Sequence, residues 1–218
     1  MKEKIVAHAL MYMAAVLLLF AARPGIAGVI TGSLHDFTAS AWSGGRICVA
    51  CHTPHKADMT VSDAPLWNHK NSTQSYTLYA STSLNATMGQ PGSTSKLCLS
   101  CHDGTVAVDS FGGATGTTTI SAANNIGTSL ADDHPIGFTY NTALASADGS
   151  LHDPTTKTVT IGTGAQTKTG TINSLLLYSG KMECSTCHDV HNTFTVGSSG
   201  LTKMAQAGSQ ICFACHNK

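Results

Sequence analysis

Cys48-Val49-Ala50-Cys51-His52 is the first copy of a motif that organises the whole chain. The same pattern, Cys-x-x-Cys-His, returns at residues 98–102, 184–188 and 212–216. The four copies use all 8 cysteines of the 218-residue sequence, so no cysteine remains for other chemistry. What the four motifs bind therefore decides how the chain folds.

A Cys-x-x-Cys-His motif is the attachment site of a c-type haem, because its two thiols bond to the porphyrin and its histidine reaches the iron. Zinc is one alternative, but structural zinc sites usually separate their histidines from the cysteines. A redox disulfide is another, but it does not explain a histidine after every pair. The sequence thus predicts four covalently attached haem c groups. The attachment residues are Cys48, Cys51, Cys98, Cys101, Cys184, Cys187, Cys212 and Cys215, and the proximal ligands are His52, His102, His188 and His216.

Residues 1–27 have the pattern of a secretory signal peptide. Lys2 and Lys4 precede an apolar run over residues 9–22, and Gly25-Ile26-Ala27 supplies small residues for cleavage. The run is short for a membrane span, and an uncleaved anchor helix is the alternative. We expect residues 28–218 to form one exported tetrahaem domain, because oxidising compartments suit this thiol chemistry.

The composition argues against several functions. The 12 basic and 12 acidic side chains balance, and no basic stripe suggests nucleic acid. No segment of residues 28–218 is long and apolar enough to cross a bilayer. A glycine-rich stretch at 112–116 lacks the lysine of a phosphate-binding loop, and no nucleophile triad stands out. We therefore expect a protein that is not an enzyme.

The region between the second and third motifs, about residues 105–180, is a low-charge insert rich in Gly, Thr and Ser. A disordered linker is the alternative, but such linkers usually carry more charge. Residues 157–161 and 169–173 are β-branched and predict a small hairpin around 162–166. Short helical turns are expected at 45–50, 95–100 and 201–215. The predicted fold is mostly coil with short helices and a few short strands, around a haem-stacked core.

The sixth iron ligand decides between electron transfer and small-molecule chemistry. Spare histidines are abundant enough to fill every iron, which favours two histidines per iron over methionine. The spare histidines are His35, His55, His69, His134, His152 and His191, and the competing methionines are Met59, Met88, Met182 and Met204. As distal ligands we favour His55, His191, His134 and His35. His69 is the next candidate, and His152 is the last.

The choice of His55 and His191 as distal ligands rests on their spacing from the proximal histidines. His55 and His191 each follow a proximal histidine by three residues. So short a segment cannot pass around the porphyrin to its other face, so each must serve a different haem, or none if both are ordinary solvated histidines. His134 and His35 each adjoin an aspartate, which we expect to hold the second ring N–H, as is common for metal-ligating histidines.

Six stretches of the chain look familiar together, namely residues 32–37, 51–55, 65–69, 101–105, 133–136 and 184–189. They resemble a family of exported multihaem c-type cytochromes, and above all the polymerising outer-membrane cytochrome E type of metal-reducing bacteria. The resemblance covers most of residues 28–218 and is weakest over 111–131 and 155–175. The resemblance implies bis-histidine haems, little regular secondary structure and protomers stacked into extracellular wires, with His55 ligating a haem of the adjacent protomer.

The leading hypothesis is a secreted tetrahaem electron carrier, polymerised with itself at the outer cell surface or in an extracellular filament. It would pass electrons to other redox proteins or to external acceptors. One alternative is a soluble monomeric shuttle in the periplasm. A third is a multihaem reductase, which needs one iron without a distal protein ligand.

Overall fold

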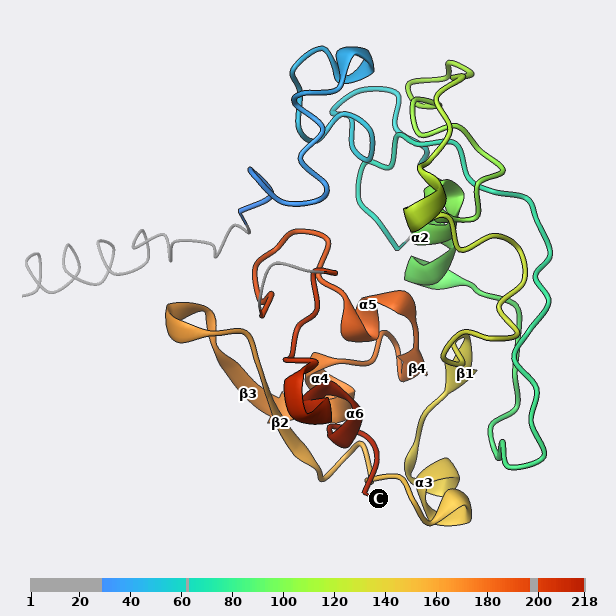
Figure 1. Ribbon diagram of the computed structural model, residues 1–218, viewed down its shortest axis with the longest axis vertical. Coiled ribbons are helices and arrows are strands. Elements are labelled where there is room, and N and C mark those ends of the chain that lie inside the picture. Colours follow the sequence, from blue (N-terminus) through green and yellow to red (C-terminus); the bar gives the residue numbers. More distant parts are fainter. Residues whose placement is uncertain (1–28, 62, 197–199, 218) are drawn as a thin grey trace, which may run out of the picture.

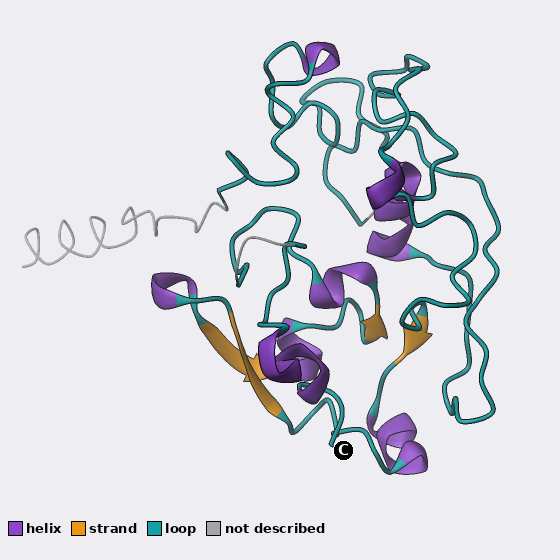
Figure 2. Cartoon of the chain, viewed as in Figure 1, coloured by secondary structure: helices purple, strands orange, loops and turns teal. Residues whose placement is uncertain are grey.

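The computed structural model describes residues 29–61, 63–196 and 200–217, so the predicted signal peptide lies outside the described residues. Most of the chain is loop and turn, and the regular elements are short (Figures 1 and 2). The expectation of mostly coil with short helices and a few strands is therefore confirmed. The helices are α2 (Ser93–His102), α3 (Thr142–Asp148), α4 (Ile172–Leu175), α5 (Cys184–Cys187) and α6 (Gln210–Phe213), with 3-10 turns η1 (Ala41–Ser43), η2 (Ala122–Asn124), η3 (Gly164–Gln166) and η4 (Ala207–Ser209).

Each cysteine motif occupies one helical turn. The second forms the end of α2, and α5 spans the four residues of the third up to its histidine. The first motif is a turn in which the His52 N–H donates to the Cys48 carbonyl at 2.8 Å, in place of the helix expected at 45–50. The expected helix at 201–215 is confined to η4 and α6, because Gly208 and Ser209 have positive φ angles of 63° and 55°.

The predicted hairpin is present. β2 (Thr158–Ile161) pairs antiparallel with β3 (Lys168–Thr171), and Val159 and Ile161 face the interior. The second strand ends earlier than expected because the Thr171 side chain accepts a hydrogen bond from the Ser174 N–H and caps α4. A second pair joins β1 (Phe138–Thr139) to β4 (Lys181–Met182).

The main apolar cluster lies between this hairpin and the C-terminal motif. It contains 11 buried residues, all between positions 138 and 215, with Ile172 fully buried at its centre. A second cluster in the N-terminal part has only three buried members, Tyr76, Leu99 and Leu130. Within the described residues, no helix is long and apolar enough to cross a membrane.

Helices α2 and α5 pack together, although some 80 residues separate them along the chain. The Cys184 N–H donates to Ser95 Oγ at 2.9 Å, and the hydroxyls of Thr94 and Ser185 hydrogen-bond at 2.7 Å. The contact brings the second and third cysteine motifs side by side.

Candidate haem-binding sites

The cysteines of the four motifs are all free thiols, and they range from the exposed Cys48 and Cys212 to the buried Cys215. Burial raises the pKa of Cys51 to about 11 and the pKa of Cys101 to about 12, and Cys51 itself contributes to the second shift. A hydrogen bond with Cys184, helped by burial, raises the pKa of Cys98 well above its ordinary value. The thiols of neighbouring motifs are thus close enough to influence each other.

The third and fourth motifs adjoin in the same way. Burial raises the pKa of Cys215 to about 12, with further increases from Cys187 and Cys212. The first and second motifs, the second and third, and the third and fourth are therefore neighbours in space.

Three of the four proximal histidines are oriented by a backbone carbonyl farther along the chain. Nδ1 of His52 lies 2.7 Å from the Pro65 oxygen, and Nδ1 of His102 lies 2.8 Å from the Asn124 oxygen. The third contact joins His188 Nδ1 to the Gly200 oxygen at 2.5 Å. Because a carbonyl only accepts, each Nδ1 carries the proton, and the lone pair of Nε2 is left for a metal.

Three proximal histidines also face a second histidine ring. The ring centres of His35 and His102 are 6.1 Å apart, those of His52 and His191 6.2 Å, and those of His134 and His216 6.5 Å. An imidazole nitrogen binds a metal at about 2.0–2.1 Å in zinc sites, so two imidazoles on opposite sides of one metal ion have ring centres about 6 Å apart. The three separations match that arrangement.

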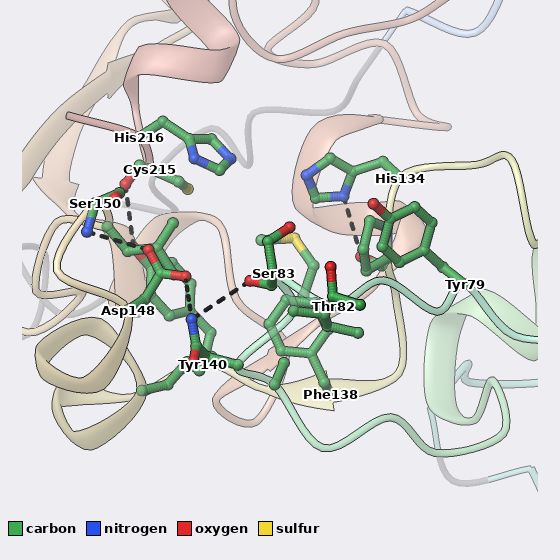
Figure 3. A pocket seen from close by; sticks show the side chains of 17 residues that line it. Tyr79, Thr82, Ser83, His134, Phe138, Tyr140, Asp148, Ser150, Cys215 and His216 are labelled. Carbon is green, nitrogen blue, oxygen red and sulfur yellow. Dashed lines mark hydrogen bonds between the residues drawn. The ribbon is translucent and has the colours of Figure 1, made fainter. Parts of the chain in front are cut away.

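One gap lies between His134 and His216. It is a cavity of about 590 Å³, within the range of about 300–1,000 Å³ that is usual for cofactor sites. Figure 3 shows the two imidazoles across this gap, with Cys215 beside His216. Its apolar lining includes Phe138, Leu144, Leu151 and Met182. Cys215, the two imidazoles and the apolar wall would suit a haem attached at the fourth motif, for which Cys212 would supply the second thiol.

The paired histidines are electrically suited to bind a metal. Burial, followed by the nearby His102, lowers the pKa of His35 to about 4. Burial also lowers the pKa of His134, although a hydrogen bond to the Pro135 carbonyl opposes this. Both rings are therefore neutral at pH 7, which is the form that ligates a metal.

The prediction that neighbouring aspartates hold the second ring N–H of His134 and His35 is wrong. His134 Nδ1 donates to the Pro135 oxygen at 3.0 Å rather than to an acid. Asp36 is taken up by its own turn, where Thr38 Oγ1 donates to it at 2.6 Å. His35 Nδ1 is buried and finds no hydrogen-bond partner among the residues that the structure describes.

The remaining candidates are placed differently. His55 and His188 are exposed and His152 is half-buried, and within the described ranges none of the three belongs to a histidine ring pair. His69 is buried beside the second motif, with Nε2 3.4 Å from Cys101 Sγ, and faces no proximal histidine of the described chain. Met182 lines the cavity, whereas Met59 is 81% exposed.

Sequence reasoning missed the carbonyl groups that hold the proximal rings. Pro65, Asn124 and Gly200 act through the backbone, so their side chains give no signal that a pattern search can find. The sequence also does not show which distal histidine faces which motif, because that pairing depends on the tertiary fold.

A comparison with protein families agrees with the chemistry of the motifs. The family described as the doubled CXXCH motif matches residues 178–218, which contain the third and fourth motifs. A search of curated proteins found no match. The C-terminal part of the chain thus carries the paired motif of multihaem c-type cytochromes, in which the cysteines bind haem c covalently and the protein takes part in electron transfer.

Proposed function

We propose that this protein is a secreted tetrahaem c-type cytochrome that carries electrons through closely spaced bis-histidine haems. The observation that carries the proposal is the set of three imidazole pairs, each with ring centres 6.1 to 6.5 Å apart and each containing a proximal histidine. The haems supply the one-electron chemistry. A haem iron ligated by two protein imidazoles would exchange electrons rather than bind substrate.

The residues of the chain have three tasks in this function. The cysteines fix each porphyrin in place, and the packing of α2 against α5 sets the second and third sites next to each other. The carbonyls of Pro65, Asn124 and Gly200 hold the proximal rings in the tautomer that presents Nε2. The apolar cluster around Ile172 keeps water from the fourth site.

The third site leads to a proposal about assembly. His188 has no ring opposite it among the described residues, while His55 is exposed and also lacks a ring partner. We propose that His55 of one protomer ligates the iron held by His188 of the next, so that protomers join into a filament. A proximal histidine without a ring opposite it and an exposed histidine on the same chain are the two halves that a head-to-tail contact between protomers would need.

The unpaired His188 also supports one other function. In a protomer that does not polymerise, this iron would keep an open position, as in a multihaem reductase or a ligand-binding shuttle. Carbon monoxide binding separates the two. A filament should bind almost none, whereas an enzyme or an isolated shuttle should bind about one molecule per chain, since only one proximal histidine stands unpaired.

The test uses the holoprotein purified from the culture medium. Mass spectrometry should find four thioether-linked haems on a chain that begins at residue 28, and low-temperature spectra should find only low-spin iron. Fewer haems would contradict the tetrahaem proposal. Recovery of the protein only from inside the cell would contradict secretion.

The variant His55→Ala tests the assembly. It should keep four haems, abolish filaments in micrographs and make one iron in four accessible to carbon monoxide. His152→Ala is the matched control, since it removes another histidine outside the ring pairs and should change neither property. Normal filaments of His55→Ala with all irons low-spin would exclude the cross-protomer ligand.

A further inference from the structure

The three histidine pairs are alike in spacing but differ in the angle between their ring planes. The planes are 16° apart in the pair at the first motif, 59° apart at the second and 77° apart at the fourth. These pairs are His52–His191, His35–His102 and His134–His216, respectively. The first pair is therefore nearly parallel, and the other two are crossed.

The proximal ring of the first pair is held from two directions. His52 Nδ1 donates to the Pro65 carbonyl at 2.7 Å, and an N–H bond of imidazole lies in the ring plane, so the position of the acceptor restrains that plane. Trp67 packs against the same ring at 6.4 Å between centres and 86° between planes. Trp67 is itself buried and donates from Nε1 to Asn71 Oδ1 at 2.8 Å. The His52 ring thus has a fixed orientation.

The distal ring of the second pair is oriented by packing. His102 has a carbonyl acceptor, the Asn124 oxygen, but His35 Nδ1 is buried and finds no hydrogen-bond partner in the described part of the chain. The nearest aromatic contact of His35, apart from His102, is Phe37, at 5.8 Å between ring centres and 78° between planes. An edge-to-face contact of this kind favours one ring orientation over others. Phe37 is therefore the residue that restrains the His35 plane.

Phe37 is restrained in turn by a short aromatic cluster. Its ring centre lies 5.2 Å from that of Trp42, which lies 5.9 Å from that of Phe111. All three side chains are half-buried. A turn in which the Ser40 N–H donates to the Phe37 carbonyl at 2.9 Å leads into η1, which carries Trp42. The orientation of Phe37 thus comes from its own loop and from Trp42.

The crossed rings of the fourth motif are supported by the backbone. His134 Nδ1 donates at 3.0 Å to the carbonyl of the next residue, Pro135, whose own ring fixes its φ angle. Figure 3 shows the His134 and His216 rings on either side of the cavity. The two crossed pairs therefore reach similar angles by different local contacts.

The angle between two axial imidazoles affects the electronic structure of a low-spin ferric haem. Each imidazole interacts through its π orbitals with an iron d orbital, and axial ligands are a principal means by which a protein tunes the iron. Parallel rings act on the same d orbital and split it from its partner. Crossed rings act on one orbital each and leave the two close in energy. Electron paramagnetic resonance distinguishes them, because parallel rings give a rhombic signal and crossed rings a strongly anisotropic signal with a large maximum g value.

We propose that this chain builds two electronic classes of haem, one with parallel ligand planes at the first motif and one with crossed planes at the second and fourth. Phe37 is the positioning residue that keeps the second pair crossed. The inference rests on the proposed bis-histidine ligation and deepens it. It depends on the orientation of neutral rings and requires no group to gain or lose a proton.

The experiment is electron paramagnetic resonance of the oxidised, frozen holoprotein. The parent protein should show a rhombic low-spin signal together with large-g signals from two haems, and the haem at the third motif adds to one class or the other. Phe37→Leu should remove the share of one haem from the large-g signal, because the His35 ring is then free to turn. Phe37→Tyr keeps the aromatic edge and should keep the parent spectrum.

Phe111→Leu is the matched control. It makes the same chemical change in the same aromatic cluster, but at a ring that contacts Trp42 rather than His35. Both classes of signal should remain as in the parent protein. A loss of large-g signal in this variant equal to that in Phe37→Leu would show that the whole cluster, and not the contact of Phe37 with His35, holds the ring.

A second measurement separates this inference from the proposed ligation. The near-infrared charge-transfer band in magnetic circular dichroism reports two imidazole ligands whatever their angle. If that band is absent, the bis-histidine proposal fails. If it is present and all signals belong to one class, the two classes are refuted, and this result needs only the parent protein. An unchanged spectrum of Phe37→Leu would refute the role of Phe37, and Phe37→Ile serves the same purpose if Phe37→Leu does not fold.

Discussion

The two ends of the molecule are stabilised in different ways. The C-terminal region, residues 138–217, holds the two strand pairs and a cluster of 11 buried residues (Figure 1). The N-terminal region, residues 29–131, has three buried apolar residues in its cluster and relies on loops, turns and the polar network at Asp103. The first region builds a core from its own side chains. We expect bound haem to take much of that role in the second.

The strongest test of this contrast is to remove the haem. In protein made without haem attachment, residues 29–131 should lose amide protection, because little apolar protein surface remains to be buried there. The hairpin of β2 and β3 should keep protection about tenfold or more above that of the N-terminal region. Hydrogen exchange followed by mass spectrometry measures both regions in one sample.

Equal loss of protection in the two regions would show that the C-terminal cluster also depends on haem. Equal retention would show that the N-terminal region folds on its own polar contacts. A holoprotein sample measured in parallel gives the reference for both regions.

A core substitution sharpens the same contrast. Ile172→Ala removes a fully buried side chain from the C-terminal cluster and should cost about 2–5 kcal/mol of unfolding free energy. Ile126→Ala makes the same chemical change at a site in the N-terminal region that is 44% exposed, and it should change stability by about 0.5 kcal/mol or less. Urea denaturation followed by circular dichroism gives both values, and a large effect at position 126 would contradict the assignment of the cores.

Lowering the pH should change the contributions of Asp103 in the N-terminal region and Glu183 in the C-terminal region in opposite directions. We expect both changes in the free energy of unfolding to be smaller than that of Ile172→Ala. The folded pKa of Asp103 is lowered, so its contribution to stability is present above the unfolded value of about 3.9 and is lost as the pH falls through the folded pKa. The folded pKa of Glu183 is raised by burial, so its contribution is fully present below the unfolded value of about 4.3 and is lost as the pH rises through the folded pKa.

The measurement is the pH dependence of unfolding in two variants. Asp103→Asn should remove part of the acid-induced loss of stability, and Glu183→Gln should make the protein more stable near neutral pH. If Glu183→Gln is less stable than the parent protein near neutral pH, the buried carboxyl has a partner that stabilises its charge.

Local patterns in the sequence predicted the local structure well. The β-branched residues at 157–161 form a strand, and the cysteine motifs form helical turns, because neighbouring residues alone decide these features. The helix expected over 201–215 is shortened at Gly208, where a left-handed backbone breaks it. The aspartate beside His35 is used by its own turn, a competition that sequence spacing does not reveal.

The pairing of histidines lies beyond such patterns. His35 faces His102, and His191 faces His52, across sequence separations that only the tertiary fold closes. The spacing of His191 after His188 predicts that His191 serves a haem other than that of His188, and its ring lies near His52 of the first motif. Which motif receives it follows from the path of the loops between them.

The carbonyls that hold the proximal rings come after those rings in the chain, by 13 residues for His52, 22 for His102 and 12 for His188. Synthesis runs from the amino end, so every one of these imidazoles emerges before the group that will restrain it. Each side chain can still rotate while its motif is newly made. The locked orientation is thus a late step in maturation, reached only when the following loop closes over its own histidine.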